Sequence, residues 1–99
     1  MPKTRSRARS ARFDLGSLYA TPGALERIEA QSRVSMMSLI ARHACGDWGD
    51  VCDKDARLND QAVDLGGRIL SSYNLDSGRI WIITEADRSA TTILTPEEY

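Results

Sequence analysis

The sequence contains no apolar run that approaches the roughly 20 residues needed to cross a bilayer. Its first residues lack the apolar segment and the small-residue cleavage site of a secretory signal. Both absences argue against a membrane or secreted protein, so we expect a cytoplasmic chain with no membrane partner. The 99 residues allow one modest core and leave no room for a second lobe or a deep cofactor crevice.

Cysteine and histidine are also scarce. Cys45 and Cys52 are too few and too close together for a disulfide framework, and in a reducing compartment we expect them to be free thiols. With His43, the only histidine, and nearby aspartates they match no common zinc signature. We therefore expect no metal site and no cofactor.

Charge is distributed unevenly along the chain. The first twelve residues carry five positive side chains and no acid, namely Lys3, Arg5, Arg7, Arg9 and Arg12. The remaining 87 residues carry eight basic and fourteen acidic side chains, a net charge of about −6. Such an arm could bind phosphate backbones without reading sequence. It could equally be a solvated leader, or fold back onto its own acidic domain.

The composition, with 41% hydrophobic and 27% charged residues, is that of an ordinary globular protein. We expect residues 1–12 to form a flexible basic arm and residues 13–99 to form a single α+β domain. Apolar side chains at the start of this domain are expected to anchor it on the core, namely Phe13, Leu15, Leu18 and Tyr19.

Three helices are predicted in the first half of the domain. Thr21 followed by Pro22 is typical of a helix start, and that helix should end near Gln31. Ser35 should cap a second, strongly apolar helix that Gly46 closes. Residues 53–65 have helical spacing of apolar side chains, and two glycines follow them.

After these glycines the apolar period becomes that of extended chain. Residues 68–73, 79–84 and 90–94 are predicted strands separated by polar turns. The middle strand is apolar on both faces, which is typical of a central strand. The predicted fold is therefore α+β, with N-terminal helices packed on a three-stranded antiparallel meander.

His43, at the end of the second predicted helix, is the most suggestive chemical residue, because the pKa of an imidazole ordinarily lies near neutrality. It could act as a general base or acid, or simply satisfy the carbonyls and dipole at the helix end. Glu85 and Arg88, in the turn before the last strand, could supply the other roles of a ribonuclease, with Tyr73 or Thr91 assisting.

Trp48 lies in a loop between two glycines and beside two acids, Asp47 and Asp50. A large loop aromatic of this kind is a candidate contact with another protein. The alternative is that Trp48 forms a lid over the core. Trp81, in the central strand, is expected to be structural.

Several segments together resemble a family of small bacterial proteins carried on plasmids and integrated mobile elements, whose members often bear labels such as plasmid-related protein or type I restriction subunit M. The resemblance covers most of residues 20–99. It is carried by residues 21–25 (TPGAL), 42–43 (RH), 46–49 (GDWG), 67–73 (GRILSSY), 80–88 (IWIITEADR), 91–94 (TTIL) and 96–99 (PEEY). The chain is too short for a methyltransferase domain and has no cofactor-binding glycine motif, so the resemblance implies a setting in mobile DNA and no catalytic residue.

Two functions therefore compete. The first, which we favour, is a non-enzymatic accessory protein that binds a host or element-encoded protein, for instance one of host restriction or CRISPR defence, with nucleic acid contacted by the arm. The second is a small metal-independent ribonuclease of barnase-like or RelE-like layout. Neither predicts an oligomeric state.

Overall fold

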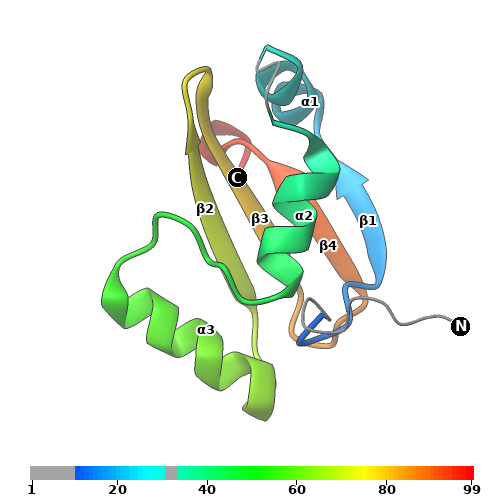
Figure 1. The fold of residues 1–99 in the computed structure, drawn as a ribbon. Helices are drawn as coiled ribbons and strands as arrows, with labels where there is room; N and C mark the ends of the chain where they lie inside the picture. The colour runs from blue at the N-terminus through cyan, green and yellow to red at the C-terminus, as the bar shows by residue number, and fades with distance from the viewer. Residues whose placement is uncertain (1–10, 31–33) are drawn as a thin grey trace, which may run out of the picture.

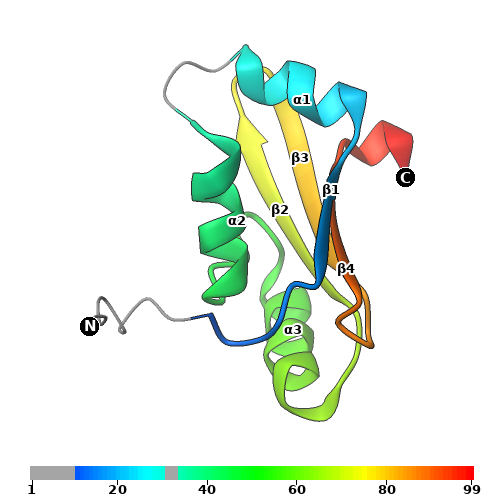
Figure 2. The same ribbon diagram turned by 90° about the vertical axis from the view of Figure 1, so that its right-hand side faces the viewer.

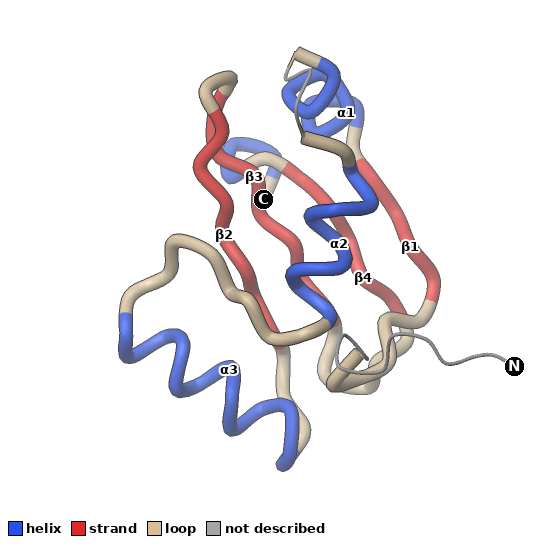
Figure 3. Tube along the Cα trace, in the orientation of Figure 1, coloured by secondary structure: helices blue, strands red, loops and turns tan. Residues whose placement is uncertain are grey.

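A computed structural model describes residues 11–30 and 34–99 (Figure 1). The three predicted helices precede the three predicted strands, and one further, unpredicted strand comes before the helices (Figure 3). The elements are, in order, β1 (Ser17–Ala20), α1 (Pro22–Glu29), α2 (Met36–Ala44), α3 (Asp53–Leu65), β2 (Ile69–Leu75), β3 (Gly78–Thr84), β4 (Ala90–Leu94) and the 3₁₀-helix η2 (Pro96–Glu98). Within these described ranges, no helix is long and apolar enough to span a membrane.

The sheet has four strands in the order β1-β4-β3-β2. β2, β3 and β4 form the predicted antiparallel meander, and β3 is an interior strand as its two apolar faces indicate. The prediction of three strands was wrong, because β1 adds to β4 in parallel, with Ser17 opposite Ala90. A parallel pairing across some 70 residues leaves no local signal, and a four-residue strand is too short to show alternation.

Local capping chemistry explains where the first two helices begin. The Thr21 hydroxyl accepts a hydrogen bond from the Ala24 N–H, and Pro22 occupies the first helical turn, as predicted. The Ser35 hydroxyl accepts from the Ser38 N–H at the start of α2. Gly46 follows α2 with φ of 90°, the positive value that glycine tolerates best.

The main core lies between the sheet and the helices α1 and α2, which cover one face, here called the inner face (Figure 2). Ile80 and Ile82 of β3 are fully buried there and pack with Ile28 of α1 and Leu39 and Ile40 of α2. Burying a side chain of this size contributes about 1.5–3 kcal/mol. This face therefore provides most of the hydrophobic stabilisation.

The segment before α1 packs less tightly than its apolar side chains suggest. Phe13 and Leu15 are half-buried against the two core clusters. Leu18 and Tyr19, however, are 46% and 58% exposed, so the expectation that they anchor the core was wrong. Their strand lies at the edge of the sheet, where nothing in the described residues covers them.

Helix α3 lies beside β2 at the other edge (Figure 1). Trp48, Ala62 and Ile69 form a small second cluster between them. The side-chain amide of Asn59 donates to the Leu70 carbonyl at 2.8 Å and accepts from the Leu70 N–H at 3.2 Å, as a neighbouring strand would. Asn59 thus caps the edge of β2 with one side chain.

The loop before α3 caps the same edge further along. The Ser72 N–H donates to the Trp48 carbonyl, and the Ser72 carbonyl accepts from the Asp50 N–H at 2.6 Å. The Asp50 carboxylate then accepts from the Asn74 N–H at 2.9 Å. A Cβ on Gly49, whose φ is 74°, would lie 2.2 Å from the Ser72 carbonyl oxygen. Glycine is therefore required for this close approach.

Replacing Asn59 by leucine removes both hydrogen bonds to β2 and leaves the buried polar groups of Leu70 unpaired. We expect Asn59→Leu to lower the free energy of unfolding by about 1–3 kcal/mol, the cost of unsatisfied buried groups. Urea unfolding followed by circular dichroism measures this change. The matched control, Gln61→Leu on the exposed surface of α3, should change stability by less than about 0.5 kcal/mol, and an equal loss in both variants would contradict the capping role.

Candidate functional site

His43 lies in the interior of the protein and is 0% exposed. Both ring nitrogens bond to strand hydroxyls: Nδ1 lies 2.6 Å from Ser71 Oγ, and Nε2 lies 2.8 Å from Thr84 Oγ1. Thr84 Oγ1 also lies 2.7 Å from Thr91 Oγ1, which donates to the Leu15 carbonyl at 2.7 Å. We call this series of hydrogen bonds the His43 chain. It joins α2 to β2, β3, β4 and the segment that enters β1.

The Leu15 carbonyl sets the direction of every proton in the His43 chain, because a carbonyl can only accept. The Thr91 hydroxyl donates its proton to the Leu15 carbonyl, so in the bond between Thr84 and Thr91 the Thr84 hydroxyl must be the donor. Thr84 must then accept from His43, which puts the imidazole proton on Nε2. Nδ1 is left to accept from the Ser71 hydroxyl. All members are satisfied with His43 neutral.

Burial opposes any charge on this ring. Desolvation lowers the pKa of His43 from 6.5 to about 4. The rings of Phe13 and Trp48 pack edge-on against the imidazole, with centroids at 5.3 and 6.0 Å. His43 is therefore a neutral, fully bonded core residue. This geometry does not present it to a substrate.

The other residues of the ribonuclease hypothesis do not form a common surface site with His43. The guanidinium of Arg88 donates to the carbonyls of Gly67 and Ala62 at 2.6 and 2.7 Å, tying the β3–β4 turn to the end of α3. The Glu85 carboxylate lies 3.6 Å from Arg68 at the surface.

Tyr73 and Thr91, the assisting residues of that hypothesis, are 1% and 0% exposed. The Tyr73 hydroxyl donates to the Asp47 carbonyl at 2.7 Å, and burial raises the pKa of Tyr73 to about 12. Thr91 belongs to the His43 chain. Both hydroxyls therefore hold the interior together.

The candidate partner-binding residues in the loop before α3 also make internal contacts. Trp48 is only 6% exposed, and its indole N–H donates to Asp60 at 3.0 Å. Trp48 therefore covers the core and does not face a partner. Asp47 makes a two-point ion pair with Arg42, at 2.7 and 3.2 Å, which lowers the pKa of the Asp47 carboxyl. The Asp50 carboxylate caps β2 through Asn74.

Of the basic residues predicted to contact nucleic acid, Lys3, Arg5, Arg7 and Arg9 lie outside the described residues. Arg12 lies on the folded domain. Its backbone N–H donates to the Ala44 carbonyl at 2.8 Å, and its guanidinium lies 3.3 Å from Asp60 and over the Trp48 ring. This guanidinium remains 40% exposed.

Cys45 is half-buried and Cys52 is exposed, and both are free thiols. Across residues 11–30 and 34–99 the structure shows no group of three or more histidine, cysteine or acidic side chains that could hold a metal ion.

The sheet face opposite α1 and α2, here called the outer face, carries residues that the sequence analysis passed over (Figure 2). Among the described residues, η2 and Tyr99 at the end of the chain fold back toward it. Strand alternation directs Trp81 to this face, because Ile80 and Ile82 on either side face the core. That alternation was the available signal. Side chains exposed or half-exposed on this face are Tyr19, Arg68, Leu70, Trp81, Thr92 and Tyr99, which together we call the outer surface.

Three members of the outer surface stack on one another. The rings of Trp81 and Tyr99 meet edge-on with centroids 5.6 Å apart. The Arg68 guanidinium lies over the Tyr99 ring at 5.3 Å and donates to its hydroxyl at 2.6 Å. Ile83, which alternation places on the same face as Trp81, is only 2% exposed. The stack is therefore an ordered aromatic and cationic surface on an apolar floor.

The C-terminal turn holds Tyr99 in this stack. The Glu98 carboxylate accepts from the Thr21 hydroxyl and from the Gly23 N–H at the start of α1, at 2.5 and 3.0 Å. It also accepts from the Thr95 N–H at 2.9 Å. These bonds, led by that from Thr21, lower the pKa of Glu98 to about 2. The turn is thereby tied to α1.

A cavity of about 260 Å³ adjoins the outer surface where α3 meets β2. Leu58 and Leu70 provide its apolar lining, and Arg68 and Asp55 provide charge. Asn59, which caps β2, completes the wall. A hollow of this kind beside exposed aromatics can accept a side chain from another molecule.

No protein-family model, curated protein or solved structure matches this chain. The functional argument therefore depends on the geometry described above.

The buried neutral imidazole makes stability depend on pH. The pKa of His43 is about 4 when folded and near 6.5 when unfolded, so the unfolded state binds more protons between these values. Stability should be complete above pH 6.5 and fall by on the order of 3 kcal/mol as the pH drops to 4. Urea unfolding at half-unit pH intervals measures this loss.

The variant His43→Asn is the control for that experiment, since His43 is the only histidine. Carboxylates titrate equally in both proteins, so their contribution cancels in the comparison. His43→Asn should be less stable at pH 7 and should lose less stability between pH 6.5 and 4. Parallel stability curves for the two proteins would show that His43 is not buried as a neutral ring.

Proposed function

We propose that this chain is a non-enzymatic accessory protein that binds a protein partner through the outer surface. The observation that carries the proposal is the Arg68–Tyr99–Trp81 stack on the sheet face opposite α1 and α2. Tryptophan, tyrosine and arginine dominate the binding energy of protein interfaces. A surface of this composition, with a hollow beside it, favours a protein ligand.

The distribution of charge supports a protein partner for this surface over a nucleic acid. Asp55 lines the adjoining cavity, and Glu85 lies beside Arg68. These carboxylates would repel phosphates at short range. The domain as a whole, with about six more acidic than basic side chains beyond residue 12, repels them at long range.

The polar residues of the interior support a role without catalysis. The His43 chain is complete with every member bonded, and the Arg88 guanidinium is bonded to backbone carbonyls. A catalytic base needs access to the proton that it removes. Binding needs no such access, so the exposed outer surface is sufficient for it.

The partner, in this proposal, belongs to the host or to the mobile element that carries the gene, and a protein of restriction or CRISPR defence is one such partner. This choice of partner is motivated by the resemblance of the sequence motifs to those of plasmid-borne proteins. Nucleic-acid contact through the basic N-terminal residues is a second part, motivated by the five cations among the first twelve residues.

Site-specific photo-crosslinking tests the surface directly. Benzoylphenylalanine placed at Tyr99 in the full chain, expressed in its native host, should crosslink to one defined protein after illumination. The same probe at Met37, which is equally exposed on α2 at 66%, should not crosslink to that protein. Nuclease treatment before analysis should leave the crosslink intact, because the contact is between proteins.

Substitution provides the quantitative version of this test. Arg68→Glu combined with Tyr99→Ser should weaken the partner's affinity at least tenfold, or about 1.4 kcal/mol, and Met37→Ser should leave it unchanged. Crosslinking of the partner protein at Met37 and not at Tyr99 would contradict the proposed surface. Degradation of RNA by the purified chain, abolished by His43→Ala, would overturn the non-enzymatic role itself.

A further inference from the structure

β1 is an edge strand, and in the described part of the chain no strand pairs with the side of β1 that faces away from β4. The N–H groups of Ser17 and Thr21 donate to Ser89 and Ile93 of the β4 side, at 3.0 Å each. Alternate residues of a strand direct their backbone groups to opposite sides, so Leu18 and Ala20 direct theirs away from β4. Within residues 11–30 and 34–99 these groups have no backbone partner. Figure 2, which looks onto this edge, shows β1 in front of the sheet with no strand or helix beyond it.

The two edge strands of the sheet differ in how many of their outward backbone groups are hydrogen-bonded. On the β2 edge every outward backbone group named above has a partner. Asn59 bonds to Leu70, residues 48–50 bond to Ser72, and the Asp50 carboxylate accepts from the Asn74 N–H. Proteins commonly protect edges in such ways against unwanted pairing. Among the described residues, one edge strand of this sheet, β2, is therefore capped, and the other, β1, is not.

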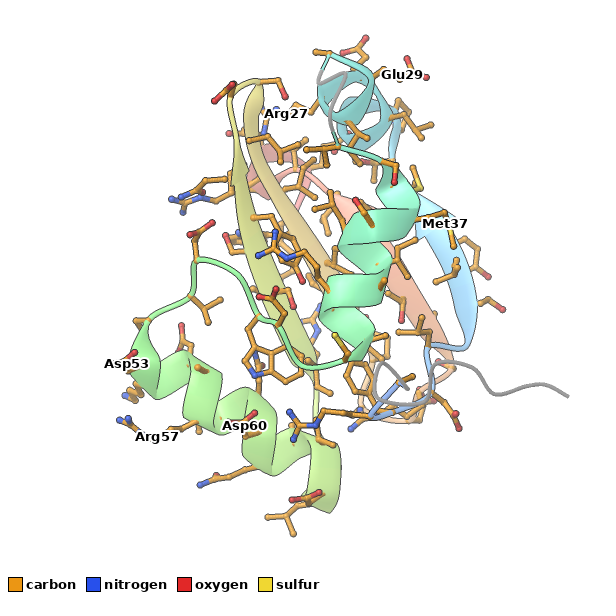
Figure 4. All side chains as sticks on the ribbon, viewed as in Figure 1. Arg27, Glu29, Met37, Asp53, Arg57 and Asp60 are labelled. Atoms are coloured by element: carbon orange, nitrogen blue, oxygen red, sulfur yellow. The ribbon has the colours of Figure 1, made fainter. Side chains whose placement is uncertain are left out.

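β1 also lacks the charges that usually keep an edge strand from pairing. Its sequence, SLYA, contains no charged residue and no proline. Leu18 is 46% exposed on the inner-face side and Tyr19 is 58% exposed on the outer face. Met37 of α2, 66% exposed and drawn on the side of α2 nearest β1 in Figure 4, adds apolar area near this edge.

We propose that β1 pairs with β1 of a second copy of this chain, antiparallel and about a two-fold axis at Tyr19. Leu18 then lies opposite Ala20 of the second copy, and each such pair exchanges backbone hydrogen bonds through the groups that are free here. The two Tyr19 side chains meet on the outer face as a non-hydrogen-bonded pair. The two four-stranded sheets become one continuous sheet.

A second copy fits this edge better than an unrelated strand because the arrangement is complementary in charge. Antiparallel pairing places the chain that enters β1 of one copy beside the start of α1 of the other. The first nine residues of that chain carry four positive charges and no acid, whereas Arg12 is paired with Asp60 of its own copy and Asp14 is the one acid before β1. Glu26 and Glu29 of helix α1 are exposed, and Figure 4 shows Glu29 on this helix. Ten extended residues reach about 33 Å, more than the roughly 12 Å length of α1.

The size of the contact sets the expected affinity. Pairing of two four-residue strands buries little surface, even with Met37 added. We therefore expect a contact in the smallest class of specific interfaces, below about 1,200 Å² in total. A dimer of this kind should form in the micromolar range. It should therefore dissociate on dilution within the range of ordinary ultracentrifugation.

Sedimentation of the full chain over a hundredfold concentration range tests the proposal. The mass should rise from 11.0 kDa toward twice that value. Tyr19→Asp, which places two carboxylates face to face at the axis, should raise the dissociation constant at least tenfold. Asn74→Asp, an equally exposed position on the β2 edge, should leave it unchanged. Circular dichroism of each variant verifies that both remain folded.

Cysteine crosslinking locates the axis. In a background with Cys45→Ser and Cys52→Ser, Tyr19→Cys should oxidise to a disulfide-linked dimer, since facing residues of a non-hydrogen-bonded pair have Cα atoms about 4.5 Å apart. Asn74→Cys should not. A monomer at every concentration without a Tyr19→Cys crosslink would overturn the proposal, and so would a dimer that Tyr19→Asp leaves intact. Neither outcome depends on the partner proposed for the outer surface.

Discussion

The hydrogen-bond chain through His43 holds the sheet and its main helix in one arrangement. Its members come from α2, β2, β3 and β4, and it ends on the Leu15 carbonyl just before β1. A buried polar network of this kind is favourable only when every member is paired, and one lost partner leaves a buried group unsatisfied. The neutral imidazole is therefore a condition for the rest of the fold, including the position of the outer surface.

This arrangement separates the interior from the surfaces that can meet other molecules. His43 and Arg88 are the side chains best suited to catalysis, but both form hydrogen bonds inside the protein. His43 bonds to Thr84 of β3, and Arg88 bonds to the carbonyls of Gly67 and Ala62. The stack at Tyr99 lies on the opposite face of the sheet, and the open edge lies at β1. In the part of the chain that the structure describes, the outer face bears exposed aromatic side chains and the outer edge of β1 has no backbone partner. This is why we propose that it acts by binding.

Local features of the sequence predicted local structure well. Thr21-Pro22 and Ser35 marked helix starts because a cap acts within four residues, and the middle strand was recognised by its two apolar faces. β1 was missed because its partner lies some 70 residues away. The setting of His43 was missed for the same reason, since its hydroxyl partners come from two different strands. Alternation alone placed Trp81 and Ile83 on one face and Ile80 and Ile82 on the other, but because both faces are apolar it could not tell which face the helices cover.

The central claim is that His43 is neutral, carries its proton on Nε2 and is sealed from water. Nitrogen-15 NMR of the labelled imidazole across the pH range measures all three properties. We predict a single Nε2–H tautomer, slow exchange of that proton, and no titration of the folded protein until the pH approaches 4. Titration near 6.5, or rapid exchange between tautomers, would show a solvent-exposed ring and would contradict the account.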